Sequence, residues 1–394
     1  MSRELTGYES RMEKELINGS FATKSNLLNL VITKIYECNR LHSGSALEAG
    51  KMSIDDEMLY DFELDSLIEK LRGAKRILVQ IPDGLKMYFP VIEKQLSSSL
   101  GSEVILSINS SFGGCDLDIH EALLLKADAL VHFGHSEYSL QEVPYEAEKL
   151  KVLFVPVYYK GDIGDELILE AAEKLRAAGA QRPVIGASVQ HVRLIPKVYE
   201  RLSSLGFSPR ISSGKRMFSG QIVGCDYTAL ISAVDSDSAL IISGGLFHAL
   251  GASFAFRGPV IQVDPYAGKV RNMEEERTKW MKRRYAEMMR AREARMWGII
   301  IGTMIGQYRP SILERLKRRI VERGMKYRLF ASHILKRENL LNLANYDIDA
   351  FVVTSCPRIP IDDFTLDPME KPVLTPGEAL SVIEGKLEVY RFPW

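Results

Sequence analysis

The chain has 394 residues, 46% hydrophobic and 26% charged, as is typical of a soluble globular protein with a sizeable core. Its 51 Lys and Arg residues balance its 51 Asp and Glu residues, so charge does not argue for direct binding of nucleic acid or of an anionic membrane. The N-terminus, MSRELTGYESRMEKEL, is too charged for a secretory signal, and the longest apolar run, near residues 296–306, is too short to span a bilayer. We therefore expect a cytoplasmic protein of about two to four domains.

The first 55 residues show no strand pattern. Apolar residues recur at helical spacing over residues 26–39, which predicts an amphipathic helix, and a second helix is predicted over 61–72. Cys38 lies at the end of the first helix without a glycine turn nearby, so we interpret it as a bystander.

From Arg76 onward, the same order of elements recurs three times. Short Val- and Ile-rich runs, typical of parallel strands buried on both faces, alternate with helical patterns. The first unit has predicted strands at 77–81, 104–108, 129–133 and 152–157, with helices at 85–98 and 117–126. The second has predicted strands at 184–187, 239–242 and 260–263, a short strand leading to Cys225, and helices at 195–205 and 227–234. The third has predicted strands at 298–301, 327–330, 350–353 and 373–374, with helices at 311–323 and 339–344.

This order predicts an α/β fold of three quasi-repeated domains, each with a central, mainly parallel sheet. The expected divisions are a helical extension (1–55) and three α/β domains (56–165 with Cys115, 166–272 with Cys225, and 273–394 with Cys356). The last domain includes a long charged helix predicted over 271–297, which is either a solvated connector or a docking face for a protein or an anionic ligand.

Three of the four cysteines follow predicted strands. Gly-Cys-Asp occurs at 114–116 and at 224–226 after the second strand of a unit, whereas Cys356 follows the third strand of its unit. Ligands of open parallel sheets bind beyond the carboxyl ends of the strands, so three units facing a common centre would bring these thiols together. Spacing alone leaves open that they are unrelated core or loop residues.

The cysteine pattern restricts the kind of metal site. In a reducing compartment, four cysteines favour metal-binding, reactive or inert thiols over a disulfide framework. No CxxC pair is present, so a zinc ribbon and a local ferredoxin motif are excluded. Three thiolates suit an iron–sulfur cluster with one open iron, because a [4Fe–4S] cluster normally takes four ligands. An open iron can bind a substrate.

An ordered series of motifs carries a family resemblance. The series is QIPDGL (80–85), GGCD (113–116), HFGHS (132–136), SVQ (188–190), GCD (224–226), SGG (243–245) with His248, DP (264–265) and SCP (355–357). It resembles the archaeal diphthamide-biosynthesis family of radical 3-amino-3-carboxypropyl transferases. Single motifs are weak, but their order is specific, and the resemblance covers roughly residues 60–394.

The resemblance implies a homodimer in which Cys115, Cys225 and Cys356 hold one [4Fe–4S] cluster per subunit. It further implies that the reduced cluster cleaves the Cγ–S bond of S-adenosylmethionine, leaving methylthioadenosine. The aminocarboxypropyl group would then be transferred to a histidine of translation elongation factor 2. An electron donor such as a ferredoxin is implied as a partner.

The S-adenosylmethionine pocket is expected at the same strand ends. Paired glycines permit close backbone approach, and a glutamine can hydrogen-bond a carboxylate or an amine. The candidate contacts are His135, Ser136, Gln190, Gly244, Gly245, His248 and Asp264. No pair of carboxylates and no Ser-His-Asp order indicates acid–base or acyl chemistry, so no catalytic residue is expected beyond the cluster.

Two alternatives compete with this interpretation. Quinolinate synthase also resembles a triplicated α/β protein with three cysteines on an open cluster, but the IPDGL, HFGHS and SCP motifs argue against it. The second alternative is a non-catalytic partner subunit, or a scaffold holding zinc or an electron-transfer cluster. An inactive subunit would be expected to lack a ligand, whereas all three cysteines are present.

Overall fold

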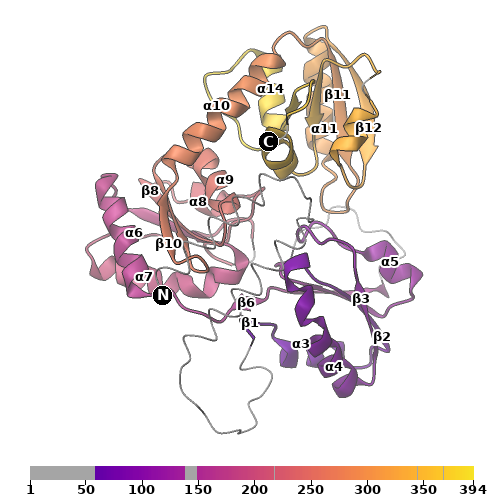
Figure 1. Ribbon diagram of the computed structural model, residues 1–394, viewed down its shortest axis with the longest axis vertical. Coiled ribbons are helices and arrows are strands. Elements are labelled where there is room, and N and C mark those ends of the chain that lie inside the picture. The colour runs from indigo at the N-terminus through magenta and orange to yellow at the C-terminus, as the bar shows by residue number, and fades with distance from the viewer. Residues whose placement is uncertain (1–57, 138–148, 217, 344, 367) are drawn as a thin grey trace, which may run out of the picture. The chain divides into compact units, whose positions relative to one another are not determined.

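The computed structural model describes residues 58–394, except 138–148, 217, 344 and 367. The predicted helix at 26–39, Cys38 and the extension over 1–55 lie outside the described residues. Residues 58–394 form a unit of their own that contains three four-stranded sheets and a two-stranded pair (Figure 1). No helix among the described residues combines the length and the apolar character that crossing a membrane requires.

The first sheet is parallel throughout, with strand order β3-β2-β4-β5. Its strands are β2 (Arg76–Gln80), β3 (Glu103–Ser107), β4 (Ala129–Phe133) and β5 (Lys151–Val155). The helices of this unit are α3 (Leu64–Leu71), α4 (Phe89–Leu100) and α5 (Ile119–Leu124), with the 3₁₀ turn η2 (Asp83–Tyr88). Val79 and Val131 pack into the core that contains α3 and α4 residues, whereas Leu78 and Leu130 pack with α5 residues. Both faces of the central strands β2 and β4 are buried, which explains their largely apolar sequences.

The third sheet has the same order, β12-β11-β13-β14, and is also parallel. Its strands are β11 (Met296–Gly302), β12 (Lys326–Ser332), β13 (Ala350–Val353) and β14 (Val373–Leu374). The helices of this unit are α11 (Pro310–Glu322), α12 (Arg337–Leu341), α13 (Phe364–Leu366) and α14 (Pro376–Glu384), with the π-helical turn η5 (Ile359–Asp363). Trp297 and Val352 pack with α11 and α14, whereas Ile300 and Val353 pack with α12. The first and third units therefore share one topology.

The second sheet departs from this pattern at both edges. Its parallel strands are β7 (Pro183–Ala187), β8 (Ser238–Ile242) and β9 (Val260–Asp264). Strand β10 (Lys269–Asn272) pairs antiparallel with β9. The helices of this unit are α6 (Asp165–Ala177), α7 (Ile195–Ser204), α8 (Thr228–Ile231) and α9 (Phe247–Ala255), with the 3₁₀ turn η4 (Val189–Leu194). The predicted strand before Cys225 is reduced to two isolated parallel bridges, from Val184 to Arg210 and from Ala187 to Gln221. The intervening sequence, ISSGKRMFSG, lacks the apolar run that a buried strand needs.

The α/β fold with mainly parallel sheets is confirmed, and several element predictions need correction. The charged stretch 271–297 is not one helix: β10 ends at Asn272, α10 spans Glu274–Arg290, and β11 begins at Met296. The helix expected over 61–72 begins at Leu64, because Tyr60–Asp61 (β1) pairs antiparallel with Tyr158–Tyr159 (β6). Helices α6, α9 and α14 were not predicted. The domain boundaries stay a prediction.

Helix α10 is anchored in the third unit by a buried ion pair. Arg284 and Glu378 have fully buried side chains joined by two hydrogen bonds, Nε to Oε1 at 2.8 Å and Nη2 to Oε2 at 2.6 Å. Arg284 also donates to the carbonyl oxygens of Pro360 and Val373 and to the hydroxyl of Thr365. This inner face of α10 is therefore occupied by the protein itself.

Candidate functional site

The three predicted cluster cysteines line one pocket with a volume of about 200 Å³. Cys115 lies in the loop between β3 and α5, Cys225 lies just before α8, and Cys356 lies between β13 and η5. Each thiol belongs to a different four-stranded sheet region, is partly buried and forms no disulfide. The convergence expected from the strand ends is therefore present in the structure.

Burial controls the protonation of the Cys115 and Cys356 thiols. Burial raises the pKa of Cys115 to about 11, and the neighbouring Cys225 adds to the rise, while the amide of Gln307 opposes it. Burial raises the pKa of Cys356 to about 12, with further contributions from Cys115 and Cys225. In the absence of a cation, Cys115 and Cys356 are thus neutral at pH 7. A bound metal centre would supply the positive charge that stabilises their thiolates.

A turn from the third sheet region closes over Cys115. The backbone N–H of Gly306 donates to the carbonyl oxygen of Cys115 at 2.9 Å, and the Gln307 amide Nε2 donates to Cys115 Sγ at 3.5 Å. A Cβ atom on Gly306 would lie 2.5 Å from the Cα atom of Cys115, so only glycine allows this approach. The turn fixes the Cys115 loop directly.

A chain of hydrogen bonds fixes the tautomer of His135 on the pocket wall. The backbone N–H of Asp118 donates to Gln80 Oε1 at 3.3 Å, which identifies that amide atom as the acceptor. His132 Nδ1 lies 2.8 Å from the same oxygen and must therefore carry the proton, so His132 Nε2 is an acceptor. His135 Nδ1, 2.8 Å from His132 Nε2, must in turn be the donor.

Both histidines in this chain are neutral at pH 7. Burial lowers the pKa of His132 well below its usual range. Burial, and then His248, lowers the pKa of His135 to about 4. The Nε2 atom of His135 is consequently a bare hydrogen-bond acceptor.

Comparison with known proteins identifies the family. The profile of the diphthamide synthesis protein family matches residues 81–391. The chain belongs to this family. It is 31% identical over 340 residues to the 2-(3-amino-3-carboxypropyl)histidine synthase of Pyrococcus horikoshii, covering 85% of this chain and 94% of that protein. It is 29% identical over 324 residues to subunit 1 of the Homo sapiens synthase, covering 81% of this chain and 71% of that protein. The resemblance predicted from the ordered motifs is confirmed.

Two solved structures of this family are similar to the chain. The crystal structure of Dph2 from Pyrococcus horikoshii with a 4Fe-4S cluster superposes with a TM-score of 0.73 at 30% identity, covering 85% of this chain and 94% of that one. A second crystal structure of the same Dph2 superposes with a TM-score of 0.74 at 29% identity, covering 86% and 95%. The fold is therefore that of the diphthamide synthesis family.

Four of the seven predicted S-adenosylmethionine contacts line the cysteine pocket: His135, Ser136, Gln190 and His248. The Nε2 atom of Gln190 donates to the carbonyl oxygen of Gly134 at 2.6 Å, joining the second sheet region to the first. Ser136 accepts a hydrogen bond of 2.6 Å from Gln221 Nε2. Burial, and then Arg358, lowers the pKa of His248 to about 4.

The other three predicted contacts do not line this pocket. Asp264 accepts backbone hydrogen bonds from Gly245, Tyr266 and Ala267, each at 3.1 Å, so its carboxylate stabilises the turn after β9. A Cβ atom on Gly244 would lie 2.5 Å from the ring of Tyr266. The Tyr266 ring therefore makes the close approach to Gly244 that was expected of the ligand.

Several pocket residues were missed by the sequence reasoning. Arg358 directly follows the SCP motif, donates to Asp362 at 2.9 Å and lies 5.2 Å from the centre of the Phe247 ring. Arg216 forms a mostly buried ion pair with Asp226 at 2.8 Å. Their nearness in sequence to Cys356 and Cys225 was an available signal. No comparable local signal marked Gln307.

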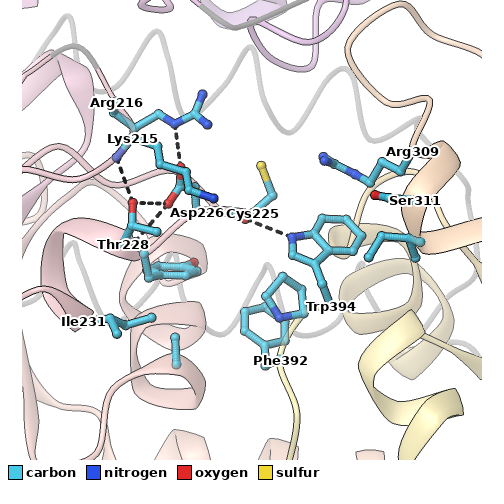
Figure 2. Close-up of a pocket in the computed structure, with 14 residues that line it drawn as sticks. Lys215, Arg216, Cys225, Asp226, Thr228, Ile231, Arg309, Ser311, Phe392 and Trp394 are labelled. Carbon is cyan, nitrogen blue, oxygen red and sulfur yellow. Dashed lines mark hydrogen bonds and ion pairs between the residues drawn. The ribbon is translucent and has the colours of Figure 1, made fainter. Parts of the chain in front are cut away.

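A second pocket, of about 360 Å³, opens beside Cys225 (Figure 2). Lys215, Arg216 and Arg309 give it a basic lining. The indole Nε1 of Trp394 donates to the carbonyl oxygen of Cys225 at 3.3 Å, and the Arg309 guanidinium lies 4.1 Å from the centre of the Trp394 ring. Cys225 and Arg216 line both pockets, so this basic surface adjoins the cysteine site.

The donor set is compatible with a metal cluster. Three cysteine thiols line one pocket, and cysteine thiolates are the usual ligands of iron–sulfur centres. Within the described ranges, no three His, Cys, Asp or Glu side chains are arranged to hold a single metal ion. A cluster contains several irons, so its thiolates lie farther apart than the ligands of one ion.

Proposed function

We propose that this protein transfers the 3-amino-3-carboxypropyl group of S-adenosylmethionine to a histidine of translation elongation factor 2, the first step of diphthamide biosynthesis. The observation that carries the proposal is the convergence of Cys115, Cys225 and Cys356, from three sheet regions, on one pocket. Family membership supports it, since relatives at about 30% identity are named 2-(3-amino-3-carboxypropyl)histidine synthases. It is further supported by the 4Fe-4S cluster in the similar Dph2 structure.

The three thiolates would hold a [4Fe–4S] cluster and leave one iron without a protein ligand. When bound, such a cluster supplies the electron that cleaves the Cγ–S bond of S-adenosylmethionine. The role of the chain would be to orient the sulfonium so that this bond, and not the bond to the adenosyl carbon, is the one that is cleaved. No acid–base residue is needed for that selection.

Side chains on the pocket wall match the polar groups of S-adenosylmethionine. The bare Nε2 atom of His135 accepts a hydrogen bond from the α-ammonium group, and the Arg358 guanidinium attracts the α-carboxylate. Ser136, Gln190 and His248 complete the polar lining. Because His135 and His248 have pKa values of about 4, both remain uncharged at neutral pH and do not repel the sulfonium.

The proposal includes three partners and a location that rest on the family resemblance. We infer a homodimer working in the cytoplasm, with elongation factor 2 as the protein substrate and a ferredoxin as the electron donor. The basic pocket beside Cys225 adjoins the cysteine site. Its positively charged side chains would attract an acidic segment of the protein substrate.

The test is product identification. The protein is reconstituted anaerobically with iron and sulfide, reduced with dithionite and supplied with S-adenosylmethionine and elongation factor 2. We expect methylthioadenosine as the nucleoside product and addition of one aminocarboxypropyl group to one histidine of the factor. If 5′-deoxyadenosine is the main product, the sulfonium is held in the other orientation. In a parallel reaction supplied with iminoaspartate and dihydroxyacetone phosphate, consumption of these two compounds would instead identify a quinolinate synthase.

A further inference from the structure

The Gln307 side chain contacts the sulfur of a proposed cluster ligand. Its Nε2 donates to Cys115 Sγ at 3.5 Å, although 192 positions separate the two residues in sequence. The side chain is only 5% exposed, so water competes little for the amide proton. A buried donor aimed at a thiolate acts in a low-dielectric environment, where it strongly influences the charge on sulfur.

The protein backbone holds this donor in place. Gly306 N–H donates to the Cys115 carbonyl oxygen at 2.9 Å, and Gln307 N–H closes the turn onto the Met304 carbonyl oxygen at 2.8 Å. The absence of a Cβ atom on Gly306 lets the two backbones approach. The amide of Gln307 is therefore positioned by the same contact that fixes the Cys115 loop.

We propose that Gln307 is a positioning residue that raises the reduction potential of the cluster through its N–H···S hydrogen bond to Cys115. The proposal rests on the [4Fe–4S] centre of the proposed function. Reduction adds negative charge that spreads onto the ligand sulfurs, and a hydrogen-bond donor stabilises that charge more in the reduced state than in the oxidised state. Removing the donor therefore makes reduction harder.

Cys356 provides an internal comparison. The backbone N–H of Arg358 hydrogen-bonds Cys356 and, like the Gln307 amide at Cys115, opposes the rise of the thiol pKa. A backbone donor is present whichever side chain occupies position 358. The donor to Cys115 comes from a side chain, so substitution at position 307 can adjust the potential.

The experiment measures the midpoint potential of the reconstituted protein by redox titration monitored with electron paramagnetic resonance. In Gln307→Leu, which keeps the bulk and loses the donor, we expect the ratio of reduced to oxidised cluster at a fixed potential to fall about tenfold, or about 59 mV for a one-electron couple. Gln307→Glu, which also adds a negative charge, should lower the ratio further. The matched control is Gln221→Leu, because the buried Gln221 side chain lines the cysteine pocket but its amide donates to Ser136 Oγ and not to a cysteine sulfur. In this control, the ratio of reduced to oxidised cluster at the same potential should change less than about twofold.

A fully loaded Gln307→Leu protein with the wild-type midpoint potential would overturn the proposal. If this variant does not assemble a cluster, the wild-type protein is labelled with ¹⁵N-glutamine and examined in its reduced state by pulsed electron paramagnetic resonance. Coupling of the cluster spin to an amide ¹⁵N that is retained in Gln190→Leu and in Gln221→Leu protein supports the contact, and absence of that coupling rejects it. The potential is independent of product identity, so methylthioadenosine formation tests the proposed function and the potential tests Gln307.

Discussion

At the scale of single residues, the chain from Asp118 through Gln80 and His132 determines which proton His135 carries. Each step is a hydrogen bond of 2.8 to 3.3 Å in which only one partner can donate. The HFGHS motif made His135 predictable as a pocket residue, because it follows a strand. Its tautomer was not predictable, since it depends on Gln80 from a neighbouring strand and on the backbone of Asp118.

His135→Leu should weaken the binding of S-adenosylmethionine about tenfold without loss of iron, because one hydrogen bond to a charged group is removed. Isothermal titration of the loaded, oxidised protein measures the affinity. The control is His120→Leu, which alters an exposed histidine at the start of α5, outside the cysteine pocket. Equal affinities of His135→Leu and wild type would contradict a contact between His135 and the ligand.

His191 should make the stability of the protein depend on pH. Burial, and then His248, lowers its folded-state pKa to about 4, against about 6.5 in the unfolded chain. Between these values the unfolded chain binds more protons, so stability falls as the pH is lowered through this window. At pH 5 the loss from this residue amounts to about 2 kcal/mol.

The variant His191→Gln, which cannot titrate, tests this. Urea unfolding at pH 7.5 and at pH 5 gives the stability difference between wild type and variant. We expect that difference to shift by about 2 kcal/mol in favour of the variant at the lower pH. If wild type and variant differ in stability by the same amount at pH 7.5 and at pH 5, His191 is not held neutral in the folded protein.

At the scale of elements, the apolar strands were predictable and the connections between units were not. Strands such as β4 and β8 are buried throughout and are mostly apolar, with one buried polar residue each, His132 and Ser238. The charged sequence around α10 concealed the short strand β10 and the start of β11 at Met296, and Arg284 looked like one more surface charge. Its burial depends on Glu378, which lies 94 positions away.

Arg284→Met should destabilise the protein by about 3–5 kcal/mol, because it leaves the Glu378 carboxylate buried without its partner. Burial acts to raise the pKa of Glu378, but Arg284 helps to outweigh burial, and the pKa is lowered overall. The stabilisation by this pair is therefore lost as the pH falls through the lowered folded-state pKa. Denaturant unfolding at pH 7 measures the effect.

The double variant Arg284→Met/Glu378→Leu removes both charges and should recover much of the lost stability. A double variant no more stable than Arg284→Met would show that the unpaired charge is not the cause.

At the scale of the whole described chain, three sheet regions meet through the loops that carry the cysteines. The third region contacts both of the others there: Gly306 and Gln307 bind Cys115, and Trp394 binds the backbone of Cys225. The sequence predicted this convergence from the shared position of the cysteines at strand ends. The contacts that hold the loops together were not predictable, because they join residues more than a hundred positions apart.

Metal analysis of anaerobically reconstituted protein tests whether Cys115, Cys225 and Cys356 together hold one cluster, as proposed. Iron, sulfide and the electron paramagnetic resonance signal are measured for four single alanine variants. We predict that Cys115→Ala, Cys225→Ala and Cys356→Ala each lose the stable cluster, whereas Cys38→Ala retains about four irons per chain, as in wild type. Retention of the full iron content and signal by any of the first three variants, or their loss in Cys38→Ala, would show that these three cysteines are not the ligands of one cluster.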